Sequence, residues 1–320
     1  MPELSSKSND QGRAFEYITL VKLWNRIREV RDAEIEKNSS YYASEKSWNN
    51  ISQKVKQNLE RAAISAVETI IDLEPLILED GDDTVNLLIQ PDTQGKEGDV
   101  RDILIIRRDI QWEIGLSIKH NHFAAKHSRL AKTLDFGRKW YDVPCSESYW
   151  KDVAPVFNFL EEARTKQIAW KDLSDKENDV YIPLLNAFLE EIKRSDDAQE
   201  HVPRKMVEYL LGKYDFYKVI SVDNLKITQI LTFNLRGTLN KNSASKRPEY
   251  HIPVAALPTR IVWSGFKPGS KNTVEIYMDG GWQFSFRIHN ASTIVEPSLK
   301  FDIQIIGMPT TIVAINSIWR

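Results

Sequence analysis

Residues 98–119 read GDVRDILIIRRDIQWEIGLSIK, and this stretch decides the fold. Two apolar runs, over residues 102–107 and 112–120, flank a short polar turn, a pattern that predicts an antiparallel β-hairpin. Because side chains alternate between the faces of a strand, Ser117 and Lys119 share one face. The hairpin register places Asp102 opposite Ser117 or Lys119. A carboxylate and an ammonium group are therefore expected to meet at the open end of the hairpin.

The pairing of Asp102 with Lys119 is what magnesium-assisted hydrolysis of a phosphodiester requires. A carboxylate holds the hard cation Mg2+, which polarises phosphoryl oxygens and helps to generate hydroxide from water. A lysine orients or deprotonates that water and offsets negative charge in the transition state. A salt bridge across a surface hairpin would use the same two residues, so the spacing alone leaves both interpretations open.

Around the hairpin the pattern of apolar residues predicts an α+β protein. The first half is expected to hold a mixed core, with helices over residues 12–31 and 47–72, a strand over residues 84–90 and a helix over residues 123–134. The second half begins with helices over residues 157–169, 182–194 and 203–214. Strands follow over residues 216–222, 226–234, 260–263, 273–278, 283–289 and 300–306. We therefore expect a catalytic core over residues 1–150 and a helical, then β-rich region over residues 151–320.

The composition excludes several classes of protein. Of the 320 residues, 42% are hydrophobic and 28% charged, which is typical of a globular chain. The sequence contains no apolar run of the ~20 residues that span a bilayer and no polar–apolar pattern of a signal peptide at its start. Cys145 is the single cysteine, so a disulfide framework is excluded and zinc ligation by thiolates is disfavoured. We expect a cytoplasmic protein without membrane contact.

Positive charge is concentrated in two stretches, although the net charge is only -2. Residues 117–139 contain six Lys or Arg, three His and one acid, and residues 236–247 contain four Lys or Arg and no acid. Such segregation fits a phosphate-binding face, and solvated loops or helix faces are the alternative. The residues predicted to contact DNA are His120, Asn121, His122, Lys126, Arg129, Lys241, Lys246 and Arg247. His127 falls on the apolar stripe of the helix expected over residues 123–134 and is expected in the core.

The sequence resembles a known nuclease family. The spacing Asp-x14-Ser-x-Lys, from Asp102 to Lys119, is similar to the PD-(D/E)xK nuclease motif. The strings GLSIKHNH (residues 115–122), KHSRL (residues 126–130) and GRAFEY (residues 12–17) resemble the HaeIII family of type II restriction endonucleases. The resemblance covers the first half of the chain. It implies a restriction-endonuclease-like mixed sheet flanked by helices, Mg2+ dependence and double-stranded DNA as the substrate. For the family's name-giving member it implies cleavage within GGCC.

One position departs from the motif. Ser117 stands where the motif has Asp or Glu, and a hydroxyl is a poor ligand for Mg2+. A second carboxylate must then come from elsewhere. The candidates are Asp99, just before the first strand, and Asp135, at the far end of the helix expected over residues 123–134. Glu113 shares a face with Lys119 but lies about 20 Å away along an extended strand, so we interpret it as structural. Asp92 is interpreted as a turn residue.

We predict that Glu16 supplies the missing carboxylate. On helical spacing Glu16 continues a stripe formed by Leu20, Leu23, Ile27 and Val30, which places it at the edge of the core. A carboxylate at such a position needs a partner, and a metal ion is a suitable one. GRAFE (residues 12–16) is also similar to the N-terminal helix of junction resolvases, whose glutamate binds metal. The alternative is a glutamate that the helix dipole or an arginine stabilises.

The resemblance also implies partners. A palindromic DNA site read by a homodimer is expected, because two strands of opposite polarity need two equivalent active sites. A DNA methyltransferase is expected to act on the same site without forming a stable complex. A structure-specific nuclease such as a junction resolvase is an alternative, although such enzymes are usually smaller. A DNA-binding protein without catalysis is a second alternative, but it would need neither Asp102 nor Lys119.

Overall fold

The computed structural model of the chain describes residues 2–91, 98–121 and 124–319. It divides into two units, each made of segments far apart in the sequence. Unit 1 combines residues 1–123, 212–255 and 310–320, and unit 2 combines residues 124–211 and 256–309. We expected a linear boundary at residue 150 instead. The division differs because strands from the last third of the chain join the sheet that contains the predicted hairpin.

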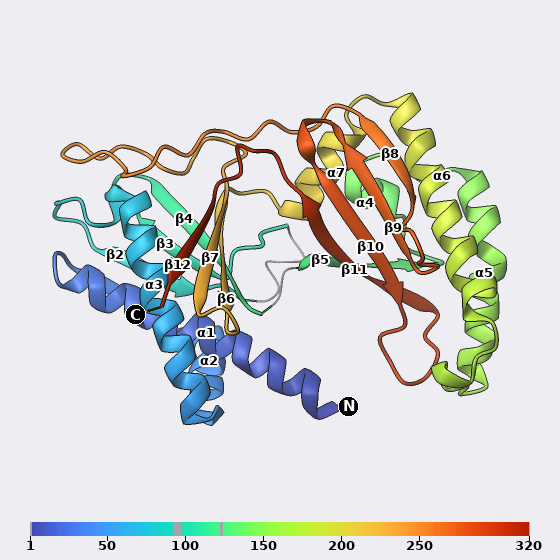
Figure 1. The fold of residues 1–320 in the computed structure, drawn as a ribbon, viewed down its shortest axis with the longest axis horizontal. Helices are drawn as coiled ribbons and strands as arrows, with labels where there is room; N and C mark the ends of the chain where they lie inside the picture. Colours follow the sequence, from blue (N-terminus) through green and yellow to red (C-terminus); the bar gives the residue numbers. More distant parts are fainter. Residues whose placement is uncertain (1, 92–97, 122–123, 320) are drawn as a thin grey trace. The chain divides into compact units, whose positions relative to one another are not determined.

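Within the described residues, unit 1 holds a mixed sheet of seven strands in the order β1-β2-β3-β4-β6-β7-β12 (Figure 1). β1 pairs with β2 and β4 pairs with β6 in parallel, and the other neighbours are antiparallel. The strands are β1 (Ala33–Glu36), β2 (Val85–Ile89), β3 (Ile103–Arg107), β4 (Trp112–His120), β6 (Phe216–Val222), β7 (Ile227–Phe233) and β12 (Ala314–Ile318). The three strands expected near residues 84–120 are confirmed as β2, β3 and β4. The two edge strands, β1 and β12, were not predicted.

Helices α1 (Pro2–Arg28), α2 (Ser39–Asn50) and α3 (Gln53–Leu73) pack with this sheet around one apolar core. Leu20, Leu23 and Ile27 of α1 are fully buried in it, as the helical stripe predicted. Val30 is 48% exposed because it lies beyond the last residue of α1. The stripe prediction was therefore wrong for Val30.

The single helix expected over residues 47–72 is two helices. Ile51 and Ser52 have extended backbone conformations, with ψ of 157° and 154°, and they separate α2 from α3. Ser52 is the N-cap residue of α3, a position at which the backbone is extended and the helix has not yet begun. The apolar spacing of α3 continues to Leu73, which is fully buried.

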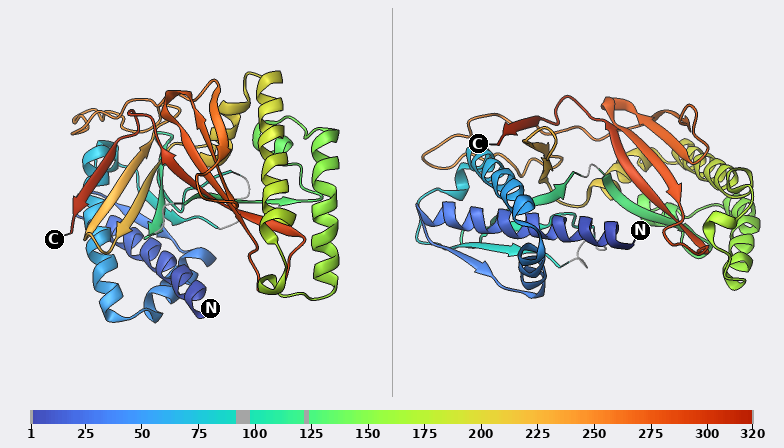
Figure 2. Two further views of the ribbon diagram at one scale, coloured as in Figure 1. Left: turned by 45° about the vertical axis from the view of Figure 1, so that its right-hand side comes forward. Right: turned by 60° about the horizontal axis from the view of Figure 1, so that its bottom comes forward.

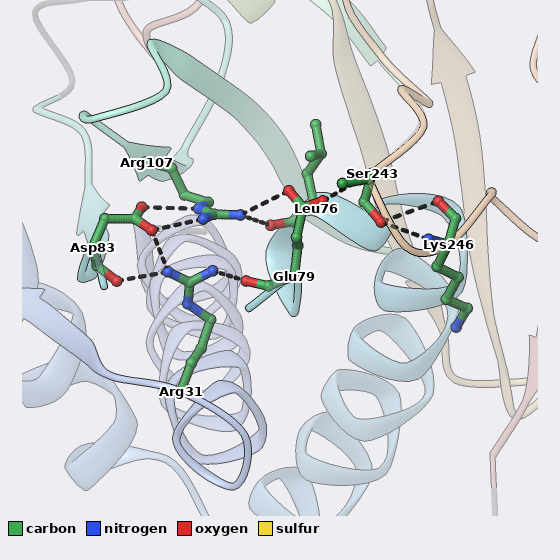
Figure 3. A network of polar contacts seen from close by, with 8 residues as sticks. Arg31, Leu76, Glu79, Asp83, Arg107, Ser243 and Lys246 are labelled. Atoms are coloured by element: carbon green, nitrogen blue, oxygen red, sulfur yellow. Dashed lines mark hydrogen bonds and ion pairs between the residues drawn. The ribbon is translucent and has the colours of Figure 1, made fainter. Parts of the chain in front are cut away.

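A buried cluster of ion pairs joins the end of α1 to the end of β3 (Figure 3). Arg107 donates two hydrogen bonds to Asp83, at 2.6 and 2.9 Å, and one to the carbonyl oxygen of Leu76 at 2.8 Å. Arg31 also bonds to Asp83, at 2.5 Å, and to the carbonyl oxygen of Glu79. Hydrogen bonds from Arg107, opposed by burial and assisted by Arg31, hold the pKa of Asp83 well below its usual range. Asp83, the last residue of the acidic run at residues 79–83, thus has a structural role.

Within the described residues, unit 2 holds an antiparallel sheet of five strands in the order β5-β11-β10-β9-β8. The strands are β5 (Ala124–Ala131), β8 (Ile261–Phe266), β9 (Thr273–Met278), β10 (Gln283–His289) and β11 (Ser298–Gly307). The helix expected over residues 123–134 was wrong, because this segment is the strand β5, paired with β11 along its length. Cross-strand pairing overrides the local helical spacing. His127, expected in the core, has a side chain that is 44% exposed.

Helices α4 (Phe136–Tyr141), α5 (Glu147–Thr165), α6 (Ile182–Ala198) and α7 (Val202–Leu211) complete unit 2. The three helices expected in this region are present as α5, α6 and α7, although α5 begins ten residues before the predicted start at residue 157. α4 was not predicted. α5 and α6 lie side by side, as both views of Figure 2 show. Aromatic rings form the core, with Phe188 at 5.0 Å from Phe301 and 5.6 Å from Trp140 between ring centroids. Both units together confirm the α+β class.

Glu74 is a fully buried carboxylate at the end of α3. Its Oε1 accepts hydrogen bonds from the hydroxyl of Tyr217 at 2.5 Å and from the backbone of Asn240 at 2.6 Å. Within the described residues, its Oε2 has no hydrogen-bond partner. Burial raises the pKa of Glu74 to about 7, although the hydrogen bonds from Tyr217 and Asn240 oppose the shift.

This raised pKa predicts that unit 1 loses stability as the pH rises. The folded-state pKa of Glu74 exceeds its usual value of 4.5, so its stabilising contribution is full below pH 4.5 and is lost as the pH passes about 7. We expect Glu74→Gln to remove a pH-dependent difference on the order of 3 kcal/mol in the free energy of unfolding. Denaturant unfolding of both proteins at pH 5 and pH 8 measures it. Parallel pH profiles would contradict the prediction.

Candidate active site

The hairpin of β3 and β4 has the predicted register. Ile103 lies opposite Leu116, and the backbone N–H of Asp102 donates to the carbonyl oxygen of Leu116 at 2.7 Å. Asp102 therefore lies opposite Ser117, one residue beyond the regular pairing of the two strands. The prediction that Asp102 would meet Ser117 or Lys119 across the hairpin is confirmed.

One carboxylate oxygen of Asp102 accepts three hydrogen bonds from residues of β4. Its Oδ2 accepts from the backbone N–H of Ile118 at 2.6 Å, from Nζ of Lys119 at 2.9 Å and from Oγ of Ser117 at 3.3 Å. The side chains of Asp102 and Lys119 are 25% and 31% exposed, so the ion pair is accessible to solvent. Ser117 is buried. A half-open carboxylate–lysine pair with one oxygen fixed by the protein is able to receive a cation and a phosphate.

Lys218 is a residue of this site that sequence reasoning missed. It lies on β6, which runs parallel to β4, and it is paired directly with Ser117. Lys218 is only 4% exposed. Burial, assisted by nearby Lys119 and opposed by Asp102, lowers its pKa to about 7. The sequence signal that could have revealed it was a lysine inside the mostly apolar run FYKVISV (residues 216–222). In the structure every residue of this strand is buried.

Glu16 lies on α1 with a partly buried side chain, at the edge of the core as the stripe predicted. Its Oε2 accepts a hydrogen bond from Oγ of Ser44 on α2 at 3.3 Å. Within the described residues, no group of three or more His, Cys, Asp or Glu side chains is arranged to hold a metal ion. A cation at Asp102 could also be held by water and by phosphate oxygens of the DNA. Mg2+ is commonly bound in this way.

Asp99 is bound to the guanidinium group of Arg101. Nε and Nη2 of Arg101 donate to its two carboxylate oxygens at 2.8 and 2.7 Å. Burial opposes ionisation, but these bonds outweigh it, so the pKa of Asp99 lies below its usual value. Arg101 also pairs with Glu113 at 2.8 Å and crosses Gly115, where a Cβ atom would lie 2.0 Å from the arginine side chain. Asp99 would have to release Arg101 to bind a metal ion, and the structural interpretation of Glu113 fits this ion pair.

Asp135 was predicted as a possible metal ligand and Asp92 as a turn residue. Asp135 belongs to unit 2, where it is the N-cap residue of α4 and accepts hydrogen bonds from the backbone of Arg138 at 2.9 Å and Cys145 at 3.1 Å. It begins a helix, whereas we expected it at the far end of one. Asp92 lies outside the described residues.

His120 and Asn121, predicted to contact DNA, connect the end of β4 to the turn after β6. Nδ1 of His120 lies 2.8 Å from the hydroxyl oxygen of Ser221, and Oδ1 of Asn121 accepts from the backbone of Asp223 at 3.0 Å. Burial lowers the pKa of His120, and Asp223 opposes the shift. Asn121 is exposed, with a left-handed φ of 49°. Both residues border the site, and His122 lies outside the described residues.

Lys126 and Arg129, predicted as phosphate contacts on a helix, lie on β5 in unit 2 and bind protein groups. Nζ of Lys126 donates to the carbonyl oxygen of Tyr209 at 2.7 Å and lies 3.9 Å from the centroid of its ring. Burial, with a contribution from Lys139, lowers the pKa of Lys126 to about 8. Arg129 pairs with Glu296 at 3.0 Å. These contacts favour a structural role for Lys126 and Arg129.

The basic stretch at residues 236–247 belongs to unit 1, the unit that contains Asp102. Its start is held by Asp215, which accepts hydrogen bonds from the backbone of Leu235, Arg236 and Thr238 at 2.8 to 2.9 Å. Lys241, Lys246 and Arg247, the predicted DNA contacts, are exposed. A firmly held loop that presents exposed basic side chains is suited to phosphate contact.

A carboxylate and a lysine that converge at the open end of a β-hairpin form the arrangement expected of a PD-(D/E)xK nuclease. Comparison with known proteins also indicates a DNA nuclease. The HaeIII restriction endonuclease family matches residues 12–309. Type II restriction enzyme HaeIII from Haemophilus aegyptius is 54% identical over 318 residues, which cover 99% of this chain and 100% of that protein. No solved structure matches the chain.

The chain belongs to the HaeIII restriction endonuclease family. The resemblance seen in the sequence is thereby confirmed and extends over both halves of the chain. The protein is a type II restriction endonuclease, a site-specific DNA nuclease. The alternatives of a junction resolvase and of a non-catalytic DNA-binding protein are set aside. None of the described helices combines the length and the apolar character needed to cross a membrane.

Proposed function

We propose that this chain cleaves double-stranded DNA within GGCC, that it requires Mg2+, and that Asp102 and Lys119 carry the reaction. The observation that carries the proposal is the bond between Asp102 and Lys119 at the end of the hairpin, in a chain 54% identical to type II restriction enzyme HaeIII. Cytoplasmic DNA is the expected substrate. The cognate methyltransferase acts on the same site and forms no stable complex with this chain.

The residues at the hairpin end fit a bound Mg2+ ion. Asp102 would hold the ion, because all three of the hydrogen bonds described for it involve Oδ2 and the side chain is a quarter exposed. The bound ion would polarise the scissile phosphate and lower the pKa of a water molecule. Nζ of Lys119 lies next to Asp102 and would orient this water and offset charge on the phosphate. Ser117 holds Asp102 in position and is not a metal ligand in this proposal.

We assign the second carboxylate to Glu16, as the helical stripe suggested. Its partial burial and its position on α1, which contacts β4, support the assignment. Asp99 and Asp135 are the alternatives, and each is already engaged by Arg101 or by the N-terminus of α4. The chain is proposed to act as a homodimer on its palindromic site.

The proposal is tested by incubating the purified protein with a plasmid that contains GGCC sites, in the presence of Mg2+. We expect a set of fragments whose ends map within GGCC, and no cleavage when EDTA removes the metal ion. A plasmid with methylated GGCC sites is the matched control and should stay intact. Fragments with ends outside GGCC would overturn the assigned site, and cleavage in EDTA would overturn the metal requirement.

The exposed basic residues of the 236–247 loop are expected to bind phosphate and to lie close to the bases that are read. Replacing Lys241, Lys246 and Arg247 together by alanine should weaken duplex binding and lower the slope of log Kd against log salt by about 3 per subunit. The turn formed by Ser243 and Lys246 uses backbone and serine atoms, so the loop should keep its shape. Fluorescence anisotropy at several salt concentrations measures the slope. Unchanged affinity, salt slope and site preference would exclude the loop.

A further inference from the structure

Lys218 shares one face of the sheet with the cleavage residues. In a parallel pair of strands, residues in register point to the same face, so Lys218 points to the side of Ser117. Lys119 lies two residues further along β4 and points to that side as well. Asp102 is bonded to both Ser117 and Lys119. Two lysines and a carboxylate thus converge at this end of β4 and β6.

Lys218 lies in an unusual place for a lysine, inside a buried strand. Every residue of β6 is buried, and Phe216 and Ile220, the neighbours of Lys218 on the same face, are apolar. A lysine that is 4% exposed loses most of its hydration, which destabilises the charged form and makes an apolar residue the more stable choice. Burial lowers the pKa of Lys218 to about 7 in the protein without DNA, and a phosphate beside it would raise this pKa and favour the charged form. A costly charge of this kind, next to a reaction centre, indicates a functional requirement.

The reaction supplies such a requirement. The superfamily motif has a carboxylate at the position of Ser117, and that carboxylate would bring negative charge and a metal ligand to the scissile phosphate. This chain has a neutral hydroxyl there and a lysine in the adjacent position on β6. A phosphodiester gains negative charge on its oxygens during cleavage, so a second fixed cation would stabilise the transition state.

We infer that Lys218 is a second lysine of the cleavage site, which contributes positive charge to the scissile phosphate beside Lys119. The inference rests on the proposed function, because it takes the phosphodiester next to Asp102 and Lys119 as the substrate. It goes beyond that function by adding a residue from a strand about 100 positions away in the sequence.

The first test compares Lys218→Met and Lys218→Arg with the wild-type protein. We expect Lys218→Met to lower the single-turnover rate on a GGCC duplex by about 100-fold, while its melting temperature stays equal or rises because a buried charge is removed. Lys218→Arg should recover part of the rate. Tyr217→Phe is the matched control, since Tyr217 is the adjacent residue of β6 and packs in the core on the other face. It should reduce stability and leave the rate unchanged.

A second test measures the charge interaction without catalysis. Duplexes with either a phosphate or an uncharged methylphosphonate at the scissile position are bound to the wild-type protein and to Lys218→Met, in the absence of Mg2+. We expect the mutation to weaken binding of the phosphate duplex several-fold and to leave binding of the methylphosphonate duplex unchanged. A methylphosphonate three nucleotides away serves as the control duplex and should bind like the unmodified one.

The outcomes separate this inference from the proposed function. If wild-type protein cuts GGCC and folded Lys218→Met cuts at the same rate, Lys218 has no role in cleavage and the inference fails alone. Equal losses of affinity for the charged and uncharged duplexes would also overturn it. If Lys218→Met does not fold, Lys218→Arg and Lys218→Gln take its place in both tests. If the wild-type protein does not cut GGCC with Mg2+, the proposed function itself fails.

Discussion

Replacing Lys119 by alanine should lower the single-turnover rate of DNA cleavage about 1,000-fold or more, because it removes the ammonium group that orients water and offsets charge at the phosphate. The Asp102→Ala variant should lose at least as much, since it removes both the expected metal ligand and the partner of Lys119. Plasmid cleavage with Mg2+ over hours, and duplex cleavage by rapid quench, measure the losses.

The two variants should differ in their effect on DNA binding. Lys119 is one cation among many phosphate contacts, so Lys119→Ala should bind a GGCC duplex nearly as well as the wild-type protein. Asp102→Asn is the matched variant for the carboxylate, because its amide oxygen is able to accept the hydrogen bond from the backbone of Ile118 without carrying charge. Melting temperatures verify the fold of each variant. Full plasmid cleavage by either alanine variant would refute the assignment of this site.

The hairpin that carries Asp102 and Lys119 was predictable because its determinants are local. Alternating apolar residues and a short polar turn fix the strands, and the register then follows within one residue. The strand ranges of β6, β9 and β10 were predicted to the residue for the same reason. Each of these runs is bounded by turn residues and is short enough for periodicity to decide.

The rest of the site depends on contacts between distant parts of the chain. Lys218 comes next to Ser117 only because β6 pairs in parallel with β4, and nothing in the local sequence shows which strands become neighbours. The same dependence on distant contacts explains why β5 was predicted as a helix. Its residues follow helical spacing but pair with β11. Lys126 and Arg129 were interpreted as free phosphate contacts on a helix, although Tyr209 and Glu296 engage them in the folded strand.

The division into two units could not be predicted either. The chain leaves unit 1 after residue 123 and returns to it at residues 212 and 310. The amino-acid composition does not change visibly at these points. The basic loop illustrates the consequence. We expected residues 236–247 to belong to a separate β-rich region, whereas they join the unit that holds Asp102. The exposed charges of residues 241–247 therefore lie in the same unit as Asp102 and Lys119.

Glu16→Gln should lower Mg2+-dependent cleavage by about 100-fold or more, if Glu16 is the second carboxylate that Ser117 cannot replace. The substitution keeps the size and the hydrogen bond to Ser44 but removes the charge. The melting temperature should therefore stay near that of the wild-type protein. The Mg2+ concentration that gives half-maximal cleavage should rise, because one ligand of the ion is lost. Cleavage rates across a range of Mg2+ concentrations measure both effects.

Matched variants decide between Glu16 and its alternatives. Ser44→Ala removes the hydrogen bond to Glu16 but keeps the carboxylate, so its cleavage should stay close to normal. Asp99→Asn should reduce stability by releasing the buried Arg101, and Asp135→Asn by weakening the N-terminus of α4, each without raising the Mg2+ requirement. If Glu16→Gln has a normal Mg2+ dependence, and Asp99→Asn or Asp135→Asn needs more Mg2+ for cleavage, that aspartate is the second metal ligand in place of Glu16. The serine at position 117 makes this assignment testable, because the strand itself supplies no carboxylate that could mask the loss.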